Sequence, residues 1–237
     1  WFKKYKIHAE YSLLNLDETN LSNAMKDIRT KDLSGINITL PYKQKIIPLL
    51  DKLINDAKST HSVNTVYLDE NDTLVGENTD VYGLQAGYLK SLVKAENKSA
   101  LVIGAGGVSP SVIFSLQKSK FKKISIINRT HEKSIFMKKN FSFLNILEWK
   151  SLESELGNFD LIINATSLGL KNNDKIELDY NKHKPKFFGK KKLFYDVIYN
   201  PDKTNFLLKG EELRNETTNG KMMFICQAQL AFKIWHN

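Results

Sequence analysis

The sequence is poor in cysteine and proline and contains no long apolar run. Its 237 residues include one cysteine, Cys226, and five prolines. A single cysteine excludes a disulfide framework and is typical of a reducing compartment. No apolar run approaches the ~18 residues of a membrane-spanning helix, and nothing at the start resembles a signal peptide. We therefore expect a soluble, cytoplasmic protein that does not bind membranes.

Positive charge exceeds negative charge, with 35 Lys and Arg residues against 26 Asp and Glu residues and a formal net charge of +9. Such a balance can indicate nucleic-acid binding. The lysines are scattered along the chain, however, so we expect a solvated basic surface and no nucleic-acid partner. A basic surface also attracts anionic small molecules. The hydrophobic content of 41% is sufficient for a packed core.

A glycine-rich turn between two apolar segments is the strongest local motif. Residues 100–103 predict a buried strand, residues 104–107 read Gly-Ala-Gly-Gly, residues 109–119 predict a helix, and residues 124–127 predict a second strand. This order within ~30 residues is the layout of a dinucleotide-binding unit. The first glycine permits a tight turn, and the next lets a pyrophosphate approach the backbone. The helix start then attracts the phosphates.

The glycine fingerprint is incomplete, because Ser109 stands at the usual spacing of a third glycine. A plain strand-to-helix turn is therefore an alternative interpretation. An NAD site has Asp or Glu about twenty residues further on, where it binds the ribose 2′-hydroxyl. This chain has Asn128, Arg129 and Thr130 there, with Lys133 one turn later. A guanidinium and a hydroxyl suit a 2′-phosphate, so we predict NADP; a solvated surface arginine is the alternative.

The rest of the chain alternates predicted helices and strands, which indicates a parallel or mixed α/β sheet. Asp17 is expected to cap the second helix. Before the glycine turn we expect helices at 1–7, 17–29, 43–58 and 82–94, and strands at 9–16, 33–41, 65–68 and 73–77. After it we expect helices at 131–139, 203–209 and 221–235, strands at 143–147, 159–164 and 193–197, an irregular excursion at 171–192, and a turn at 217–220. In the last helix we expect burial of Met222, Met223, Ile225, Cys226, Leu230 and Ile234.

Two charged residues lie at predicted strand ends outside the dinucleotide unit. Lys43 follows a turn at Pro41, and Asp80 ends a strand, so both face an edge where a cleft can open. Hydride transfer needs a group that exchanges a proton with the alcohol. A lysine held beside a carboxylate can do this, and burial would lower its pKa. Spacing alone is a weak argument, because either residue is more often a surface charge.

Seven sequence blocks carry a resemblance that covers nearly the whole chain. They are INITLPYK at 36–43, VNT at 63–65, GENTD at 76–80, GAGG at 104–107, NRT at 128–130, NATS at 164–167 and QAQLAFKIW at 227–235. Together, in this order, they resemble the shikimate dehydrogenase family. The resemblance implies an α/β substrate domain of residues 1–79 and 220–237 with a mostly parallel sheet. It also implies a Rossmann-like NADP-binding domain of residues 80–219, with the last helix returning to the first domain.

The resemblance implies an NADP-dependent oxidoreductase that reversibly reduces 3-dehydroshikimate to shikimate. That reaction belongs to the shikimate pathway, which leads to chorismate and the aromatic amino acids. The expected partner is this small-molecule substrate, and the expected assembly is a monomer or homodimer without a metal. Two alternatives remain open: a dehydrogenase of quinate or a related cyclohexene acid, and a non-catalytic NADP-binding relative.

Residue roles follow from the resemblance position by position. Lys43 would relay the proton of the C3 hydroxyl, and Asp80 would bind that hydroxyl and orient Lys43. The other implied substrate-binding residues are Thr39, Asn64, Tyr199 and Gln227. The implied NADP-binding residues are Gly104, Ala105, Gly106 and Gly107 for the pyrophosphate, Asn128, Arg129, Thr130 and Lys133 for the 2′-phosphate, and Thr166 near the nicotinamide.

The chain departs from the family pattern in two places. The family opens with a strand and a Ser-x-Ser motif that binds the substrate carboxylate, and no segment of this sequence matches them. We therefore expect the sequence to begin in the helix that follows that strand. Met222 stands where a small residue commonly lines the nicotinamide, so we expect an altered fit of the cofactor there.

Overall fold

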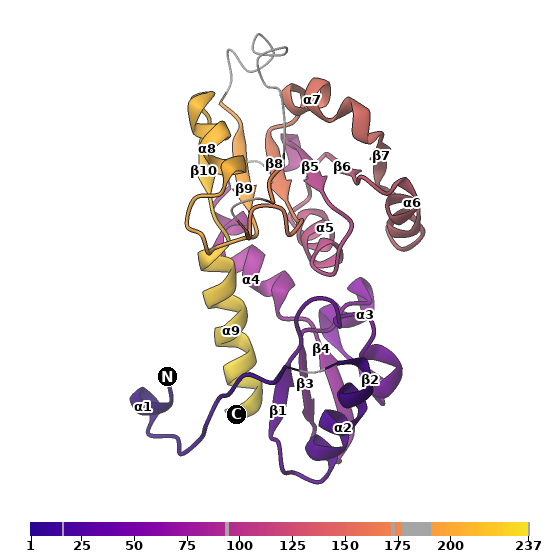
Figure 1. The fold of residues 1–237 in the computed structure, drawn as a ribbon, viewed down its shortest axis with the longest axis vertical. Coiled ribbons are helices and arrows are strands. Elements are labelled where there is room, and N and C mark those ends of the chain that lie inside the picture. The colour runs from indigo at the N-terminus through magenta and orange to yellow at the C-terminus, as the bar shows by residue number, and fades with distance from the viewer. Residues whose placement is uncertain (16, 93–94, 172–173, 177–190, 237) are drawn as a thin grey trace.

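The structure is a computed structural model that describes residues 1–15, 17–92, 95–171, 174–176 and 191–236. It has two lobes, each built on its own sheet (Figure 1). Helix α4 (Asp80–Gly87) leads from the first lobe to the second, and helix α9 (Lys221–His236) returns (Figure 1). This arrangement confirms the two-domain α/β class. Most of the irregular excursion expected at 171–192 lies outside the described residues.

Helices α4 and α9 pack closely because α4 has glycine where they meet. A Cβ atom on Gly83 would lie 2.6 Å from the backbone oxygen of Met223, and one on Gly87 would lie 2.7 Å from the backbone carbon of Met222. Any larger residue would push the helices apart. On α9 itself, Met223 and Ala231 are buried, but Met222 and Ile225 are exposed. The expected burial of Met222 and Ile225 is therefore wrong, since this helix buries only one stripe.

The first lobe holds a four-stranded sheet with the order β1-β3-β4-β2. Its strands are β1 (Gly35–Asn37), β2 (Lys52–Leu53), β3 (Thr65–Leu68) and β4 (Leu74–Glu77). The β1–β3 and β3–β4 pairs are antiparallel, and only β2–β4 is parallel. The expectation of a mostly parallel sheet is therefore corrected for this lobe. The reason is the tight turn before β4, where the Asp69 carboxylate accepts hydrogen bonds from the backbone of Asn71 and Thr73 and forces a hairpin.

The helices of the first lobe are α1 (Phe2–Tyr5), α2 (Glu18–Arg29), the 3₁₀ turn η1 (Ile47–Leu49) and α3 (Asn55–Thr60). Asp17 caps α2 as expected, accepting a 2.8 Å hydrogen bond from the backbone of Asn20. The single helix expected at 43–58 is wrong. Residues 52–53 pair with β4 instead, so sheet contacts override the local helix preference there.

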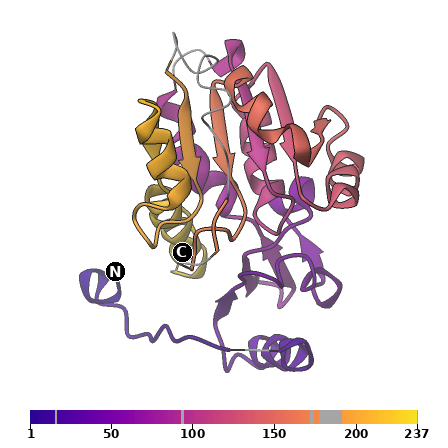
Figure 2. The same cartoon turned by 45° about the horizontal axis from the view of Figure 1, so that its top comes forward.

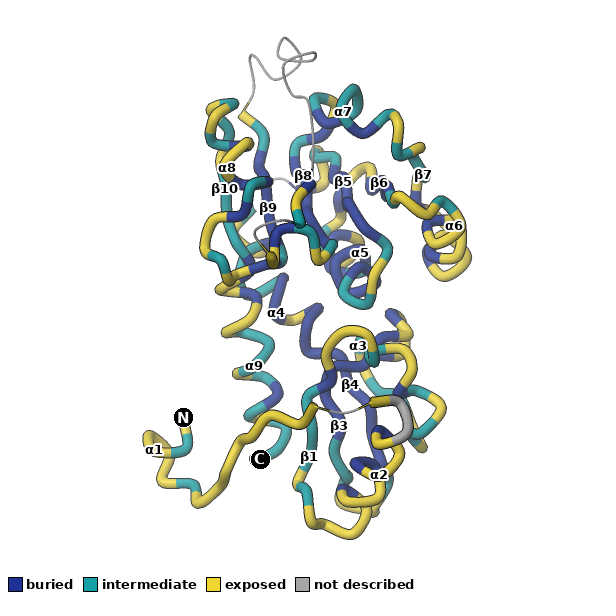
Figure 3. The backbone as a smooth tube through the Cα atoms, viewed as in Figure 1, coloured by how far each residue is buried: buried dark blue, intermediate teal, exposed yellow. Residues whose placement is uncertain are grey.

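Residues 9–15 form no strand, which corrects the expectation for 9–16. These residues are exposed (Figure 3), and Leu13 is 93% exposed. Among the described residues no strand pairs with this segment, so it lacks the backbone hydrogen bonds that would hold it in a sheet.

The second lobe holds a six-stranded sheet with the order β10-β9-β8-β5-β6-β7. Its strands are β5 (Ser99–Ile103), β6 (Lys123–Ile127), β7 (Asn145–Leu147), β8 (Leu161–Asn164), β9 (Leu193–Asp196) and β10 (Glu216–Thr218). Every pairing between them is parallel. Strand order reverses between β5 and β8, and such a switch point is where Rossmann-type sheets bind ligands. The turn expected at 217–220 is partly wrong, because residues 217–218 belong to the edge strand β10.

Helices cover both faces of this sheet (Figure 2). They are α5 (Ser109–Lys118), α6 (His131–Asn140), α7 (Leu152–Glu155) and α8 (Asn205–Glu212), with short 3₁₀ turns η2 (Leu89–Ser91), η3 (Ala95–Asn97), η4 (Trp149–Ser151) and η5 (Leu156–Asn158). Along β5, Val102 joins the core under α5, and its neighbour Leu101 joins the core under α8. Burial on both faces explains why β5 reads as a continuous apolar run. The helix expected at 82–94 is shorter, since α4 ends at Gly87.

Candidate functional site

Lys43 and Asp80 form an ion pair between the two lobes. The Lys43 Nζ atom lies 2.5 Å from Asp80 Oδ2, and the two side chains are 12% and 8% exposed. Lys43 lies in the loop after β1, and Asp80 is the first residue of α4. The sequence therefore predicted correctly that these two residues meet. A pair so shielded from water interacts more strongly than a surface ion pair.

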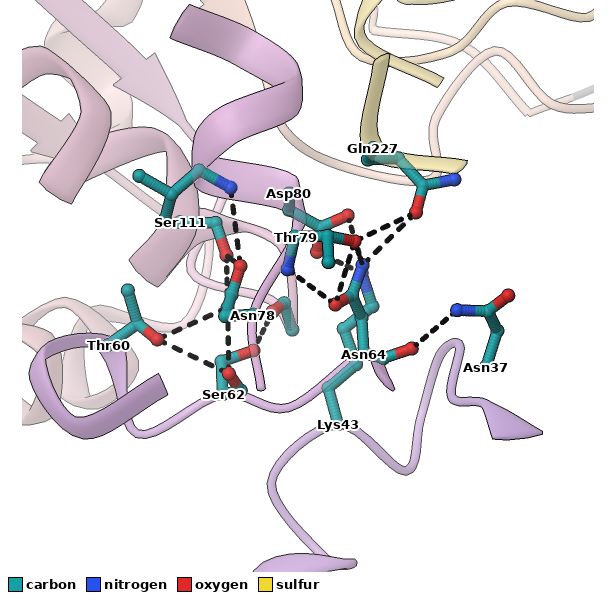
Figure 4. Close-up of polar contacts among 12 residues, drawn as sticks. Asn37, Lys43, Thr60, Ser62, Asn64, Asn78, Thr79, Asp80, Ser111 and Gln227 are labelled. Carbon is teal, nitrogen blue, oxygen red and sulfur yellow. Dashed lines mark hydrogen bonds and ion pairs between the residues drawn. The ribbon is translucent and has the colours of Figure 1, made fainter. Parts of the chain in front are cut away.

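Asn64 holds the other oxygen of the Asp80 carboxylate. Its buried side-chain amide donates to Asp80 Oδ1 at 3.0 Å and to Thr79 Oγ1 at 2.9 Å (Figure 4). The side-chain Oδ1 atom of Asn64 accepts a 2.8 Å hydrogen bond from the backbone nitrogen of Thr79. Asn37 adds a further contact, donating to the backbone oxygen of Asn64 at 3.1 Å. This network fixes the orientation of Asp80.

Gln227 reaches the same cluster from α9. Its Oε1 atom accepts hydrogen bonds from Asn64 at 3.3 Å and from Thr79 Oγ1 at 3.2 Å (Figure 4). The close approach of α4 and α9 makes this possible, because Gly83 of α4 lies directly against Gln227. The last helix therefore does fold back onto the first lobe.

Thr39 and Tyr199 are exposed residues in the loops that follow β1 and β9. Thr39 is exposed in the loop that leads to Lys43, where its backbone oxygen accepts a hydrogen bond from Tyr42. Tyr199 follows β9, and its ring stacks on Phe224 at 4.5 Å between centroids, one turn of α9 before Gln227. Among the described residues, no side-chain hydrogen bond or ion pair joins either of them to Lys43 or Asp80.

The glycine turn after β5 has the conformation that the sequence predicted. Gly104 has a φ of +110°, and a Cβ atom there would lie 2.7 Å from Thr166 Cγ2, so only glycine fits. Ser109, at the position of the missing third glycine, is fully buried. Its hydroxyl accepts from the Gly106 backbone at 3.0 Å and donates to the Gly104 oxygen at 2.9 Å. Ser109 therefore stands in place of the third glycine for a structural reason, because its hydroxyl holds the turn in place.

The residues expected at the 2′-phosphate lie together at the end of β6. Asn128 accepts from the backbone of Ala105 at 3.1 Å and donates to the backbone oxygen of Thr130 at 2.8 Å. Arg129, Thr130 and Lys133 are exposed at the start of α6. Three hydrogen-bond donors thus face solvent beside the glycine turn.

Thr166 follows the carboxyl end of β8, and hydrogen bonds to Asn164 hold it in place. Its backbone nitrogen and hydroxyl donate to Asn164 Oδ1 at 3.0 and 2.7 Å. Asn164 in turn donates to both carboxylate oxygens of Asp196 at 3.1 Å each. Asp196 is buried, and burial raises the pKa of its carboxyl to about 6, despite the hydrogen bonds that it accepts. Sequence reasoning missed Asp196, because nothing near it in the chain marks it as part of the site.

The glycine turn touches the lysine loop. A Cβ atom on Gly107 would lie 3.8 Å from the Cβ of Lys43 and 4.0 Å from Leu40 Cδ1. The glycine turn and the ion pair are therefore neighbours across the boundary between the lobes. Asn78, Ser62 and Ser111 form further hydrogen bonds near this contact, some of which join the two lobes (Figure 4). Sequence reasoning missed all three residues. The only signal was the position of Asn78 inside the GENTD block.

The described part of the chain contains no group of three or more His, Cys, Asp or Glu side chains that could hold a metal ion. None of its helices combines the length and the apolar character that crossing a membrane requires.

Comparison with known proteins identifies the family. Residues 1–66 match the family model described as shikimate dehydrogenase substrate binding domain, and residues 88–198 match shikimate / quinate 5-dehydrogenase. The chain is 46% identical over 236 residues to shikimate dehydrogenase (NADP(+)) of Pelagibacter ubique. The alignment covers 100% of this chain and 85% of that protein.

Solved structures of shikimate dehydrogenases have the same fold as this chain. The shikimate dehydrogenase of Aquifex aeolicus superposes with a TM-score of 0.87 at 33% identity, covering 99% of this chain and 84% of that one. The Thermus thermophilus enzyme, solved in complex with NADP(H) and shikimate, gives a TM-score of 0.85 at 26% identity, covering 99% and 85%. The fold, the sequence matches and the paired Lys43 and Asp80 lead to one conclusion: the chain belongs to the shikimate dehydrogenase family.

Proposed function

We propose that this chain catalyses the reversible, NADP-dependent reduction of 3-dehydroshikimate to shikimate. The observation that carries the proposal is the water-shielded Lys43–Asp80 pair next to the glycine turn. A dinucleotide turn alone would suit a binding protein, but a shielded lysine and carboxylate beside it provide proton transfer as well. Family membership supplies the substrate class.

The residues around the glycine turn fit NADP. A Cβ atom on Gly106 would have no neighbour closer than the Ala165 oxygen at 4.0 Å, so the chain's own packing does not require glycine there, whereas close approach of a pyrophosphate does. The start of α5 follows, and the positive end of its helix dipole favours bound phosphate. Arg129, Thr130 and Lys133 would hold the 2′-phosphate, and Thr166 would lie near the nicotinamide. When bound, NADP supplies the nicotinamide that accepts or donates the hydride.

Lys43 and Asp80 would handle the proton and the charge. During reduction, the ammonium of Lys43 would donate its proton to the oxygen at C3 as negative charge develops there. During oxidation, the same nitrogen would take that proton back. Asp80 would hold Lys43 in position and accept a hydrogen bond from the C3 hydroxyl. Asn64 already donates to the second Asp80 oxygen, so little reorganisation would be needed in the transition state.

The substrate would bind on the first lobe. Asn64 and Gln227, which are hydrogen-bonded to each other, would bind ring hydroxyls, and the exposed residues Thr39 and Tyr199 would close the rim, with Tyr199 at the carboxylate end. We therefore divide the chain into a substrate domain of residues 1–79 and 220–237 and an NADP domain of residues 80–219. The single cysteine supports a cytoplasmic location, and we propose a monomer or homodimer, which light scattering on the purified protein would distinguish.

The experiment is NADP⁺ reduction followed at 340 nm, with shikimate and quinate tested side by side on the purified protein. The proposal predicts a kcat/KM for shikimate well above that for quinate. A preference for quinate would assign the chain to the other branch of the family. NADPH binding without turnover of either acid would indicate a non-catalytic relative and overturn the proposal.

A further inference from the structure

Asn78 is a buried amide at the end of β4, and its hydrogen bonds point away from the substrate cluster. It is 2% exposed. Its Nδ2 atom donates to the backbone oxygen of Ser62 at 2.7 Å, to Ser111 Oγ at 2.9 Å and to Thr60 Oγ1 at 3.2 Å. Its Oδ1 atom accepts from the backbone of Val81 at 3.3 Å. The whole amide is therefore engaged, and none of it faces the substrate.

Three of the hydrogen bonds in this cluster cross between the lobes (Figure 4). Ser111 lies in the first turn of α5, directly after the glycine turn of the second lobe, and it is bonded to Asn78 of the first lobe. Ser62 of the first lobe donates through Oγ to the backbone oxygen of Gly107 at 3.0 Å. The bridging cluster, defined as Asn78, Ser62 and Ser111, thus ties the phosphate turn to the substrate lobe.

The same cluster connects to both members of the ion pair through short stretches of backbone. Val63, next to Ser62, donates a 2.8 Å backbone hydrogen bond to the Lys43 oxygen. Asn78 itself is two residues from Asp80 and accepts a hydrogen bond within the first turn of α4. A shift of α5 or of the glycine turn would therefore move Lys43 and Asp80 with it.

We propose that the bridging cluster is a positioning device that sets the distance between the bound nicotinamide and the Lys43–Asp80 pair. This inference rests on the proposed function and extends it. All three side chains are nearly or fully buried, so a broken bond leaves an unsatisfied group out of reach of water. Hydride transfer is sensitive to small displacements, and a shift of ~1 Å can cost a hundredfold in rate.

The test compares Ser111→Ala and Ser62→Ala with a matched control, Ser134→Ala. Ser134 of α6 is also fully buried, but its hydroxyl has no hydrogen-bond partner among the residues that the structure describes. We expect each bridging variant to lower kcat about tenfold or more while changing the KM for shikimate and NADP⁺ by less than about threefold, because these hydroxyls touch neither ligand. The control variant should keep the wild-type kcat.

Amide hydrogen exchange on the ligand-free protein provides a readout independent of activity. Ser111→Ala in the second lobe should increase exchange in residues 60–64 of the first lobe, and Ser134→Ala should not. If the bridging variants and the control Ser134→Ala have the same kcat and the same exchange rates, the inference is wrong. If Ser111→Ala increases exchange in residues 60–64 but leaves kcat unchanged, the positioning role is also wrong. A wild-type protein with no turnover of shikimate would overturn the proposed function itself, whatever the exchange data show.

Discussion

The carboxylate of Asp80 is shared between Lys43 on one oxygen and Asn64 on the other, at 2.5 and 3.0 Å. Both oxygens have partners before any ligand arrives, so the orientation of the carboxylate is already set. The lysine ammonium is in turn fixed by the carboxylate. In the proposed reaction, a pair that is preorganised in this way would lose little free energy to reordering.

The first prediction concerns Lys43. Replacing it with methionine keeps the length of the side chain and removes the proton. We expect kcat to fall by a factor of about 10² to 10⁴, with a much smaller change in the KM for shikimate. The exposed Lys58 of α3 gives a matched control, Lys58→Met, which should behave like wild type. An unchanged kcat for Lys43→Met would remove this residue from the mechanism.

The second prediction concerns the choice of cofactor. Arg129 is exposed beside the glycine turn, and we assign it to the 2′-phosphate. A charge-assisted hydrogen bond contributes about 1.5–3 kcal/mol, so Arg129→Ala should lower kcat/KM for NADPH about 10- to 100-fold and leave NADH nearly unchanged. Lys138→Ala, an exposed change at the other end of α6, is the control. Equal losses with both cofactors would contradict the assignment.

The third prediction concerns α9. Gln227 accepts hydrogen bonds from Asn64 and Thr79, whereas Gln229 on the same helix is exposed. Gln227→Ala should raise the KM for shikimate about tenfold, as expected for the loss of a partly buried hydrogen-bonding group, and leave the KM for NADP⁺ unchanged. Gln229→Ala should alter neither constant. The role of α9 in substrate binding fails if the two variants behave alike.

The fourth prediction concerns stability and pH. Burial raises the pKa of Asp196 from 3.8 to about 6, so between these values the folded protein keeps a proton that the unfolded chain has lost. The stability due to this group is present at low pH and is lost as pH rises through 6. From pH 4.5 to pH 7.5 the loss is about 2 kcal/mol.

Urea denaturation over this pH range checks the prediction. The wild type should lose about 2 kcal/mol that Asp196→Asn does not lose, because asparagine has no proton to titrate. Parallel curves for the two proteins would show that Asp196 is ionised throughout, and that its interaction with Thr204 and Asn164 outweighs its burial.

Local patterns were sufficient to predict the dinucleotide unit. The apolar runs of β5 and β6 and the capping residue of α2 depend on neighbours in sequence, and these elements were found where expected. The resemblance brought Lys43 and Asp80 together, although they lie 37 residues apart.

The supporting contacts could not be predicted from local sequence. Asn64 meets Gln227 across 163 residues of chain, and Asn164 meets Asp196 across 32. Each is an ordinary polar residue in its local sequence and gains its role only from packing. The strand expected at 9–16 failed for the opposite reason, since a suitable local pattern had no partner strand in the described chain.

Direct hydride transfer is the central claim, and isotope labelling tests it most directly. The protein would be incubated with NADP⁺ and shikimate that carries deuterium at C3, and the NADPH formed would be analysed by mass spectrometry and NMR. The account predicts that deuterium appears at C4 of the nicotinamide and that the labelled substrate reacts more slowly. NADPH without deuterium, or no NADPH at all, would contradict it.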